Sequence, residues 1–149
     1  DAVSRELARL RVRFIEQPLP PADDERMPGA RTASALPLMA DESCVTREDV
    51  ERLAGRFDGF NIKLVKCGGL TPALAMARRG RELGLATMTG CMLESSLLIS
   101  AGLVAAQRTD YADLDGAWLL RDDPFTGPAM DRGVLIPGSG PGWGVERKP

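Results

Sequence analysis

The sequence predicts an α/β fold made of successive βα units from a parallel (β/α)₈-type barrel. Apolar runs end in charged residues at Glu16, Asp41, Lys63 and the segment 113–115. The intervals between these ends are 25, 22 and 50 residues, and the apolar segment 85–92 divides the longest interval. A period of this length, with an apolar strand and then a helix, is typical of βα units. Because catalytic groups of a parallel barrel lie where its strands end, the charged residues are expected to share one mouth.

The expected strands are short apolar runs bounded by turn-forming residues. They comprise residues 13–15, 36–40, 60–65, 85–89 and 111–114. A parallel barrel of this kind closes with eight strands, and an open arc of five would leave two unpaired edges that are prone to aggregation. We therefore expect residues 1–149 to form a single partial barrel domain whose N-terminal part is absent.

Helices are expected between the strands. Thr46 followed by Asp49 three residues later has the pattern of a capping box, which predicts the start of a helix over 46–57. The last helix of the series is apolar on nearly every side, so it is expected to be deeply covered. The other expected helices comprise residues 2–12, 24–33, 71–83 and 94–108, and a small strand is expected at 134–136.

Composition excludes several classes of function. Basic and acidic residues number 19 and 21, a net charge of −2, so the chain has no electrostatic footprint for nucleic acid or an anionic membrane. The longest apolar stretch, 97–106, is too short to span a bilayer. The three cysteines form no closely spaced pair, which is typical of a reduced, cytoplasmic protein. The sequence does not specify the oligomeric state, so a homo-oligomer stays open.

Two acidic strand ends predict a metal site. Glu16 and Asp41 end adjacent strands, which lie about 4.8 Å apart in a sheet, so their carboxylates can meet. Two carboxylates at that distance repel each other unless a cation lies between them. The chain contains no histidine, and oxygen ligands without nitrogen partners select a hard cation, Mg²⁺ first.

Lys63 is the candidate general base, because it ends the next strand along the chain. A lysine beside a cation in a low-dielectric mouth has a lowered pKa and can remove a proton near neutral pH. Lys66 is a rival. Alternate residues of a strand face opposite sides, so only one of these two lysines faces the mouth if the strand continues. We favour Lys63, which shares a face with Asn61.

Five sequence motifs resemble the enolase superfamily, whose sites combine a lysine base with Mg²⁺. The similarity is strongest to the muconate-lactonizing subgroup, and within it to dipeptide epimerases of the L-Ala-D/L-Glu epimerase type. The resemblance covers essentially the whole chain, and the final motif is the one that points to dipeptides. The motifs are IEQP (15–18), PLMADES (37–43), NIKLVKCGGLT (61–71), GCMLESS (90–96) and DLDG (113–116).

The resemblance implies an isomerase that inverts the carbon α to a carboxylate of a small dipeptide such as Ala-Glu. It implies that Glu16 and Asp41 are Mg²⁺ ligands and that Lys63, on the sixth barrel strand, transfers the α-proton. It also implies that the two aspartates of DLDG bind the α-ammonium of the dipeptide. The expected substrate-binding residues are Asn61, Cys91, Met92, Asp113 and Asp115.

The family pattern also contains parts that this sequence lacks. A Lys-x-Lys motif, a first aspartate ligand and an N-terminal capping domain would all lie upstream of Asp1. We therefore expect barrel strands four to eight with about half of an active site, which alone would be inactive. Two alternatives stay open: a muconate cycloisomerase or o-succinylbenzoate synthase-like activity, and an inactive truncated remnant. The DLDG motif favours the dipeptide, since substrates without an ammonium need no such acidic pair.

Overall fold

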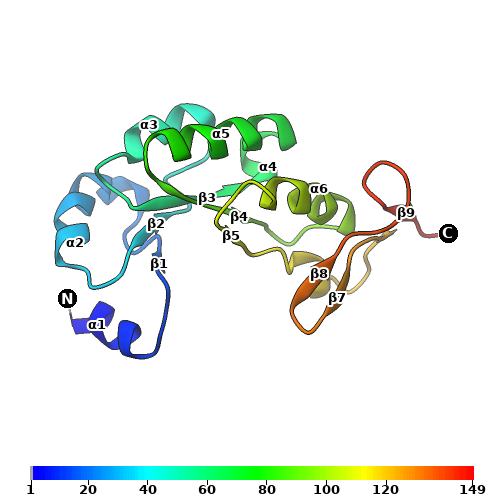
Figure 1. Ribbon diagram of the computed structural model, residues 1–149, viewed down its shortest axis with the longest axis horizontal. Helices are drawn as coiled ribbons and strands as arrows, with labels where there is room; N and C mark the ends of the chain where they lie inside the picture. Colours follow the sequence, from blue (N-terminus) through cyan, green and yellow to red (C-terminus); the bar gives the residue numbers. More distant parts are fainter. Residues whose placement is uncertain (1) are drawn as a thin grey trace.

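A computed structural model describes residues 2–149 and contains a five-stranded sheet in which every neighbouring pair of strands is parallel. The spatial order of the strands is their order in the chain, which is the arrangement of a barrel arc. The sheet curls, and α3, α5 and α6 run along one side of it (Figure 1). The strands are β1 Ile15–Glu16, β2 Leu38–Ala40, β3 Gly59–Lys63, β4 Ala86–Gly90 and β5 Tyr111–Ala112.

Short helices connect the strands, and small antiparallel pairs follow the sheet. The α-helices are α1 Ala2–Arg9, α2 Met27–Ala33, α3 Val50–Leu53, α4 Leu64–Cys67, α5 Leu70–Glu82 and α6 Ser96–Ala106. The 3₁₀ turns are η1 Pro21–Arg26, η2 Arg47–Asp49 and η3 Gly116–Leu119. At the C-terminal end, β6 Phe125–Thr126 pairs with β9 Glu146–Arg147, and β7 Ala129–Asp131 pairs with β8 Val134–Ile136.

The core lies between the outer face of the sheet and the helices that cover it. Alternate strand residues such as Leu38, Phe60 and Ile62 are fully or almost fully buried and pack with Met76 of α5. Gly80 lets α5 approach closely, because a Cβ there would overlap Phe60. Since successive residues of a strand point to opposite faces, this packing turns the intervening residues toward the inside of the arc.

The α/β barrel-arc prediction is confirmed, and several element bounds differ from expectation. The capping box of Thr46 and Asp49 is present, but the helix it opens ends at Leu53 because Gly55, with φ 80°, turns the chain. The helix expected over 94–108 was predicted to be buried on nearly every side, and this prediction is wrong for one side of α6. Leu97 and Val104 there are 39% and 43% exposed.

One difference in strand length matters for the site. The strand expected over 60–65 stops at Lys63, and residues Leu64–Cys67 form the single turn α4. Gly68, with φ 92°, ends this turn in a left-handed conformation that glycine adopts without strain. Lys66 therefore lies on a helical turn at the end of the sheet.

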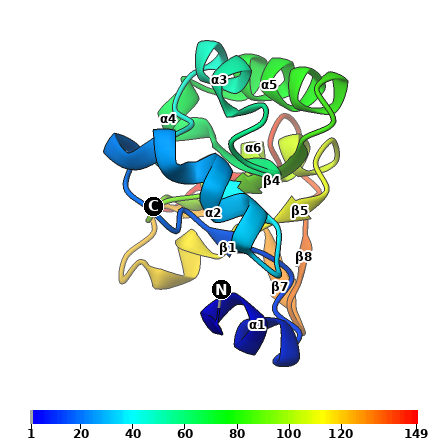
Figure 2. The same ribbon diagram turned by 90° about the vertical axis from the view of Figure 1, so that its left-hand side faces the viewer.

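No helix within residues 2–149 combines the length and the hydropathy that crossing a membrane requires. The N-terminal helix α1 lies beside β1, below the other helices in Figure 2. The β7–β8 hairpin extends away from the sheet on the side of β5 (Figure 1). These two elements lie at the two edges of the five-stranded sheet, beside β1 and β5 (Figure 1).

Candidate active site

The charged residues singled out in the sequence lie at the C-terminal edge of three neighbouring strands. Glu16 ends β1, Asp41 follows β2 and Lys63 ends β3. Neighbours of these residues in the sequence, Ile15 and Ile62 among them, pack in the outer core, so the charged side chains face the inside of the arc. Parallel strands thus gather two acids and a base from distant parts of the chain at one edge.

Asp41 is the centre of the charged cluster. It is 8% exposed, and the Lys63 Nζ donates to its Oδ2 at 2.8 Å. Lys66 Nζ donates to Oδ1 at 2.7 Å and to the Asp41 main-chain carbonyl at 2.6 Å. Burial disfavours the charged carboxylate, but the two ammonium groups outweigh this and hold the pKa of Asp41 below its ordinary value. Each oxygen of this carboxylate is therefore paired with one lysine ammonium.

The expectation that only one lysine faces the mouth is wrong. Lys63 and Lys66 both reach Asp41, because the strand stops at Lys63 and the α4 turn brings the second lysine back over the same edge. The alternation rule applied only while the chain stayed extended.

The lowered pKa expected for Lys63 depended on a neighbouring cation, and the protein groups around this lysine act in the opposite direction. Burial acts to lower the pKa of Lys63. The hydrogen bond and charge of Asp41, with a smaller contribution from Glu16, outweigh burial and raise this pKa above its ordinary value. The sequence argument assumed a neighbouring cation, whereas the nearest charged partner is a carboxylate. Lys63 is thus held as an ammonium in the ion pair.

Asn61 connects the cluster to Glu16. Its Nδ2 donates to Glu16 Oε1 at 2.7 Å, and the Asn61 side chain is 2% exposed. Gly90 provides the space for this amide, because a Cβ at position 90 would overlap the Asn61 side chain. The Oδ1 of Asn61 accepts no hydrogen bond from any part of the chain that the structure describes. Asn61 is therefore a buried residue that holds the Glu16 carboxylate through one hydrogen bond.

The loop after β4 covers Lys63 from the next strand. Met92 is 52% exposed, and its Sδ lies 3.8 Å from the Lys63 Nζ. Cys91 Sγ accepts a hydrogen bond from Gly116 N at 3.3 Å, and burial raises the pKa of the Cys91 thiol. A Cβ at Gly116 would overlap the Met92 carbonyl, so the two loops pack closely. Cys91 and Met92 are thus brought to the edge of the charged cluster.

Asp113 and Asp115 follow β5, which stops at Ala112. Both are exposed, while Leu114 between them is buried against Gly102. Their carboxylates lie near enough to Cys91 to act on its pKa. They also line a cavity of about 380 Å³ beside the β7–β8 hairpin. The structure therefore places this acidic pair one strand beyond the loop that carries Cys91 and Met92.

Three residues that the sequence did not assign to the site contribute to it, of which Lys66 had been considered only as a rival of Lys63. Lys66 contacts Asp41, Gln17 binds the chain around Asp41, and Glu94 accepts a hydrogen bond from Met92 N at 2.8 Å. Burial raises the pKa of Glu94. Gln17 and Glu94 both lie inside motifs already singled out, IEQP and GCMLESS, so their position in the motif was the available signal.

Glu16 and Asp41 offer oxygen ligands of the kind that a hard divalent cation prefers. Within residues 2–149, no group of three or more metal-ligating side chains is close enough to hold an ion. The two carboxylates are of the right chemistry for part of a coordination shell. They do not complete one.

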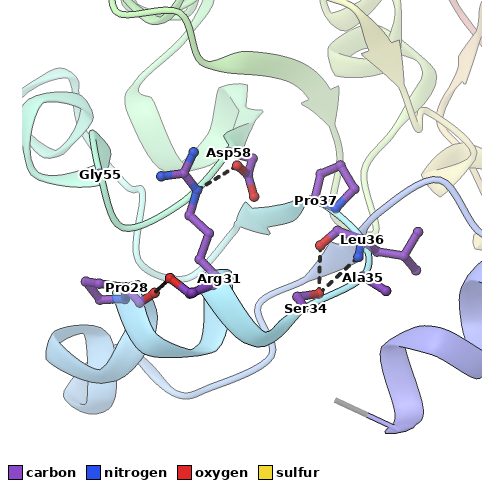
Figure 3. Close-up of a pocket in the computed structure, with 9 residues that line it drawn as sticks. Pro28, Arg31, Ser34, Ala35, Leu36, Pro37, Gly55 and Asp58 are labelled. Carbon is purple, nitrogen blue, oxygen red and sulfur yellow. Dashed lines mark hydrogen bonds and ion pairs between the residues drawn. The ribbon is translucent and has the colours of Figure 1, made fainter.

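A cavity of about 500 Å³ lies at the opposite ends of the strands, before β2 and β3 (Figure 3). Its main polar groups pair with each other: Arg31 Nε binds Asp58 Oδ1 at 2.6 Å, and Asp58 Oδ2 accepts from Leu38 N at 2.9 Å. In parallel barrels this end serves stability, and the chemistry belongs to the other end. The cavity is therefore separate from the candidate site.

Comparison with known proteins agrees with this fold. Residues 2–149 match the family model described as enolase C-terminal domain-like. An L-Ala-D/L-amino acid epimerase of Flavobacterium johnsoniae is 46% identical over 132 residues, which cover 89% of this chain and 39% of that protein. The L-Ala-D/L-Glu epimerase of Escherichia coli K12 is 48% identical over 117 residues, which cover 78% of this chain and 36% of that protein.

A solved structure shares the fold as well. The dipeptide epimerase from Cytophaga hutchinsonii, complexed with Mg and the dipeptide D-Ala-L-Val, superimposes with a TM-score of 0.86 at 30% identity. The match covers 95% of this chain and 40% of that one. The chain thus spans about two fifths of the length of the proteins it matches.

Proposed function

We propose that this chain, which belongs to the enolase C-terminal domain-like family, is part of a Mg²⁺-dependent dipeptide epimerase encoded by the complete gene. Residues 1–149 would contribute one partial barrel domain, strands four to eight, to that enzyme. The observation that carries the proposal is the ion pair of Lys63 with Asp41 at the strand edge where Glu16 also ends. A lysine beside metal-type carboxylates is suited to proton transfer at a carbon α to a carboxylate.

Lys63 would transfer the α-proton. Its ammonium must first lose a proton, and the neutral amine then takes the hydrogen from the substrate Cα as the C–H electron pair moves toward the substrate carboxylate. A second acid–base group on the opposite face, which the family resemblance places on a Lys-x-Lys motif, would return a proton to Cα. The centre is inverted while the covalent bonds of the peptide are unchanged.

Glu16 and Asp41 would hold Mg²⁺. When bound, the ion would neutralise the charge that develops on the substrate carboxylate during proton removal. Asn61 would orient Glu16, since its Nδ2 already donates to Oε1 at 2.7 Å and its burial leaves little surface for a substrate. This narrows the role first expected of Asn61, a direct substrate contact, to support of a metal ligand.

The acidic pair would recognise the other end of the dipeptide. Asp113 and Asp115 are exposed carboxylates that lie beside the loop bearing Cys91 and Met92. A free α-ammonium is the group of a dipeptide that two carboxylates bind best, through charge-assisted hydrogen bonds. Cys91 and Met92 would line the space between this ammonium and the reacting carbon.

The test is deuterium exchange with the complete gene product. The enzyme is incubated with a dipeptide library in D₂O and Mg²⁺, and mass spectrometry locates deuterium at an α-carbon. We expect exchange with Ala-Glu or related dipeptides, lost in Lys63→Ala and on addition of a chelator. Absence of exchange with every dipeptide, by a folded protein in the presence of Mg²⁺, would refute the epimerase and favour a remnant or a substrate without an ammonium.

A further inference from the structure

We propose that Gln17 is a positioning residue that fixes the spacing of the two acids Glu16 and Asp41. The inference rests on the proposed function, because it assigns those acids to one cation. Gln17 follows Glu16 directly in the chain, and its side chain reaches across to the loop after β2. It therefore contacts the segment that carries the second acid while being covalently joined to the first.

The side-chain amide of Gln17 is fully used. Its Oε1 accepts from Asp41 N at 2.8 Å and from Ser43 N at 3.1 Å. Its Nε2 donates to the Leu19 carbonyl at 2.7 Å and to Ser43 Oγ at 2.8 Å. Two acceptor lone pairs and two donors are the complete inventory of an amide side chain. A carboxylate or an aliphatic group of similar size could not make all four bonds.

The backbone at Gln17 is held in an unfavourable conformation. Its φ is 38°, in the left-handed region where a side chain other than glycine is strained. Its N–H nevertheless donates to the Met39 carbonyl at 2.8 Å, which extends the pairing of β1 with β2 to the end of the strands. Glycine at this position would relieve the strain but would lose the four side-chain hydrogen bonds.

The hydrogen bonds continue into the protein. Ser43 Oγ, which accepts from Gln17, donates to Asp24 Oδ1 at 2.7 Å, and both Ser43 and Asp24 are almost fully buried. The loop that carries Asp41 is thus anchored on one side by η1 and on the other by the end of β1. Outer groups that orient metal ligands typically contribute a factor of ten to a hundred in metal affinity.

Three variants of the complete gene product test the assignment, with Mn²⁺ as the probe and without substrate. Gln17→Leu removes all four bonds, and Gln17→Gly removes them while relieving the backbone strain. Gln107→Leu is the matched control, because Gln107 is the other glutamine within residues 1–149 and is an exposed residue at the end of α6. Mn²⁺ affinity is measured by electron paramagnetic resonance, and stability by thermal unfolding.

Positioning predicts that Gln17→Leu and Gln17→Gly both weaken Mn²⁺ binding by about ten- to a hundredfold. The glycine variant should nevertheless unfold at a temperature no lower than the leucine variant, and Gln107→Leu should bind Mn²⁺ as the wild type does. A purely structural role predicts instead that Mn²⁺ affinity follows stability and recovers in Gln17→Gly. That result, or unchanged affinity in both variants, would overturn the proposal.

The experiment distinguishes failure of this inference from failure of the proposed function. A wild-type protein that binds Mn²⁺ but exchanges no α-proton of any dipeptide would refute the epimerase and leave the role of Gln17 to be decided by its variants. A wild-type protein that binds no Mn²⁺ would refute both assignments.

Discussion

Asp41 accepts one ammonium group on each carboxylate oxygen: Lys63 on Oδ2 at 2.8 Å and Lys66 on Oδ1 at 2.7 Å. The two lysines differ in what else they touch. Lys66 also binds the Asp41 main-chain carbonyl, which ties it to the loop, whereas Lys63 has its other contact with the exposed Met92. The side chains of Lys63 and Lys66 are similarly exposed, 14% and 18%, so the additional bond to the main chain is what separates them. It makes Lys66 the structural partner of Asp41 and leaves Lys63 as the candidate base.

The same substitution in the two lysines distinguishes their roles. Lys63→Met should reduce α-proton exchange by about 10²- to 10⁴-fold, the usual contribution of a general base. Lys66→Met should retain measurable exchange but reduce the free energy of unfolding by about 1–3 kcal/mol, because a buried carbonyl and carboxylate oxygen lose a donor. Exchange rates and urea unfolding of the complete gene product check both. If Lys66→Met alone abolished exchange, the assignment of the base would be reversed.

Gly90 and Asn61 should show coupled effects on stability. A Cβ at position 90 would overlap the Asn61 side chain, so Gly90→Ala should cost about 1–3 kcal/mol of unfolding free energy. Asn61→Ala removes the overlapping atoms, so the double variant should cost less than the sum of the single variants. Urea unfolding of the four proteins measures this. Strict additivity would show that the amide and the glycine do not share the space.

The acidic pair should control selectivity for the ammonium group. Asp113→Asn and Asp115→Asn should each raise KM for a dipeptide by about tenfold or more, since a hydrogen bond to a charged group contributes about 1.5–3 kcal/mol. The KM of an N-acetylated dipeptide, which has no charge at that end, should change little. Comparison of KM for the two substrates is the measurement. Equal changes in KM for both would place the ammonium elsewhere.

The capping box predicts a pH dependence of stability at acid pH. The Asp49 carboxylate is partly buried, which disfavours its charge, but Arg52 and the N–H groups of Thr46 and Val45 lower its pKa to about 2 from the ordinary 3.8. A lowered pKa in the folded state means that the contribution is complete above the unfolded value, near pH 4. It is lost as the pH falls through about 2.

Asp49→Ala is the variant that measures this contribution. Loss of the cap should cost about 0.5–2 kcal/mol of unfolding free energy at neutral pH. The difference from the wild type should shrink between about pH 4 and pH 2. Glu48→Ala, which removes a neighbouring acid that makes none of these contacts, is the control. A difference that stayed constant across this pH range would contradict the role of the charged carboxylate.

The periodic signals in the sequence predicted most of the fold. Strand ends spaced by 25 and 22 residues predicted the order of β1, β2 and β3, and a capping pattern located η2. Such features depend on neighbours in the chain. The bounds of elements were predicted less well. Gly55 ended a helix that apolar periodicity alone would continue to 57, and the strand expected over 60–65 gave way to the turn α4 after Lys63.

The residue types of the site were readable from the sequence, since acids and a lysine at successive strand ends of a parallel sheet must share one edge. The partners of each side chain were decided only by the tertiary structure. Lys66 reached Asp41 through a one-turn helix, and the Lys63 pKa rose because its neighbour was a carboxylate. Contacts between residues about 25 positions apart, such as those of Gln17 with Asp41 and Ser43, depend on how the strands curl and where each turn ends. No local pattern in the sequence records that geometry.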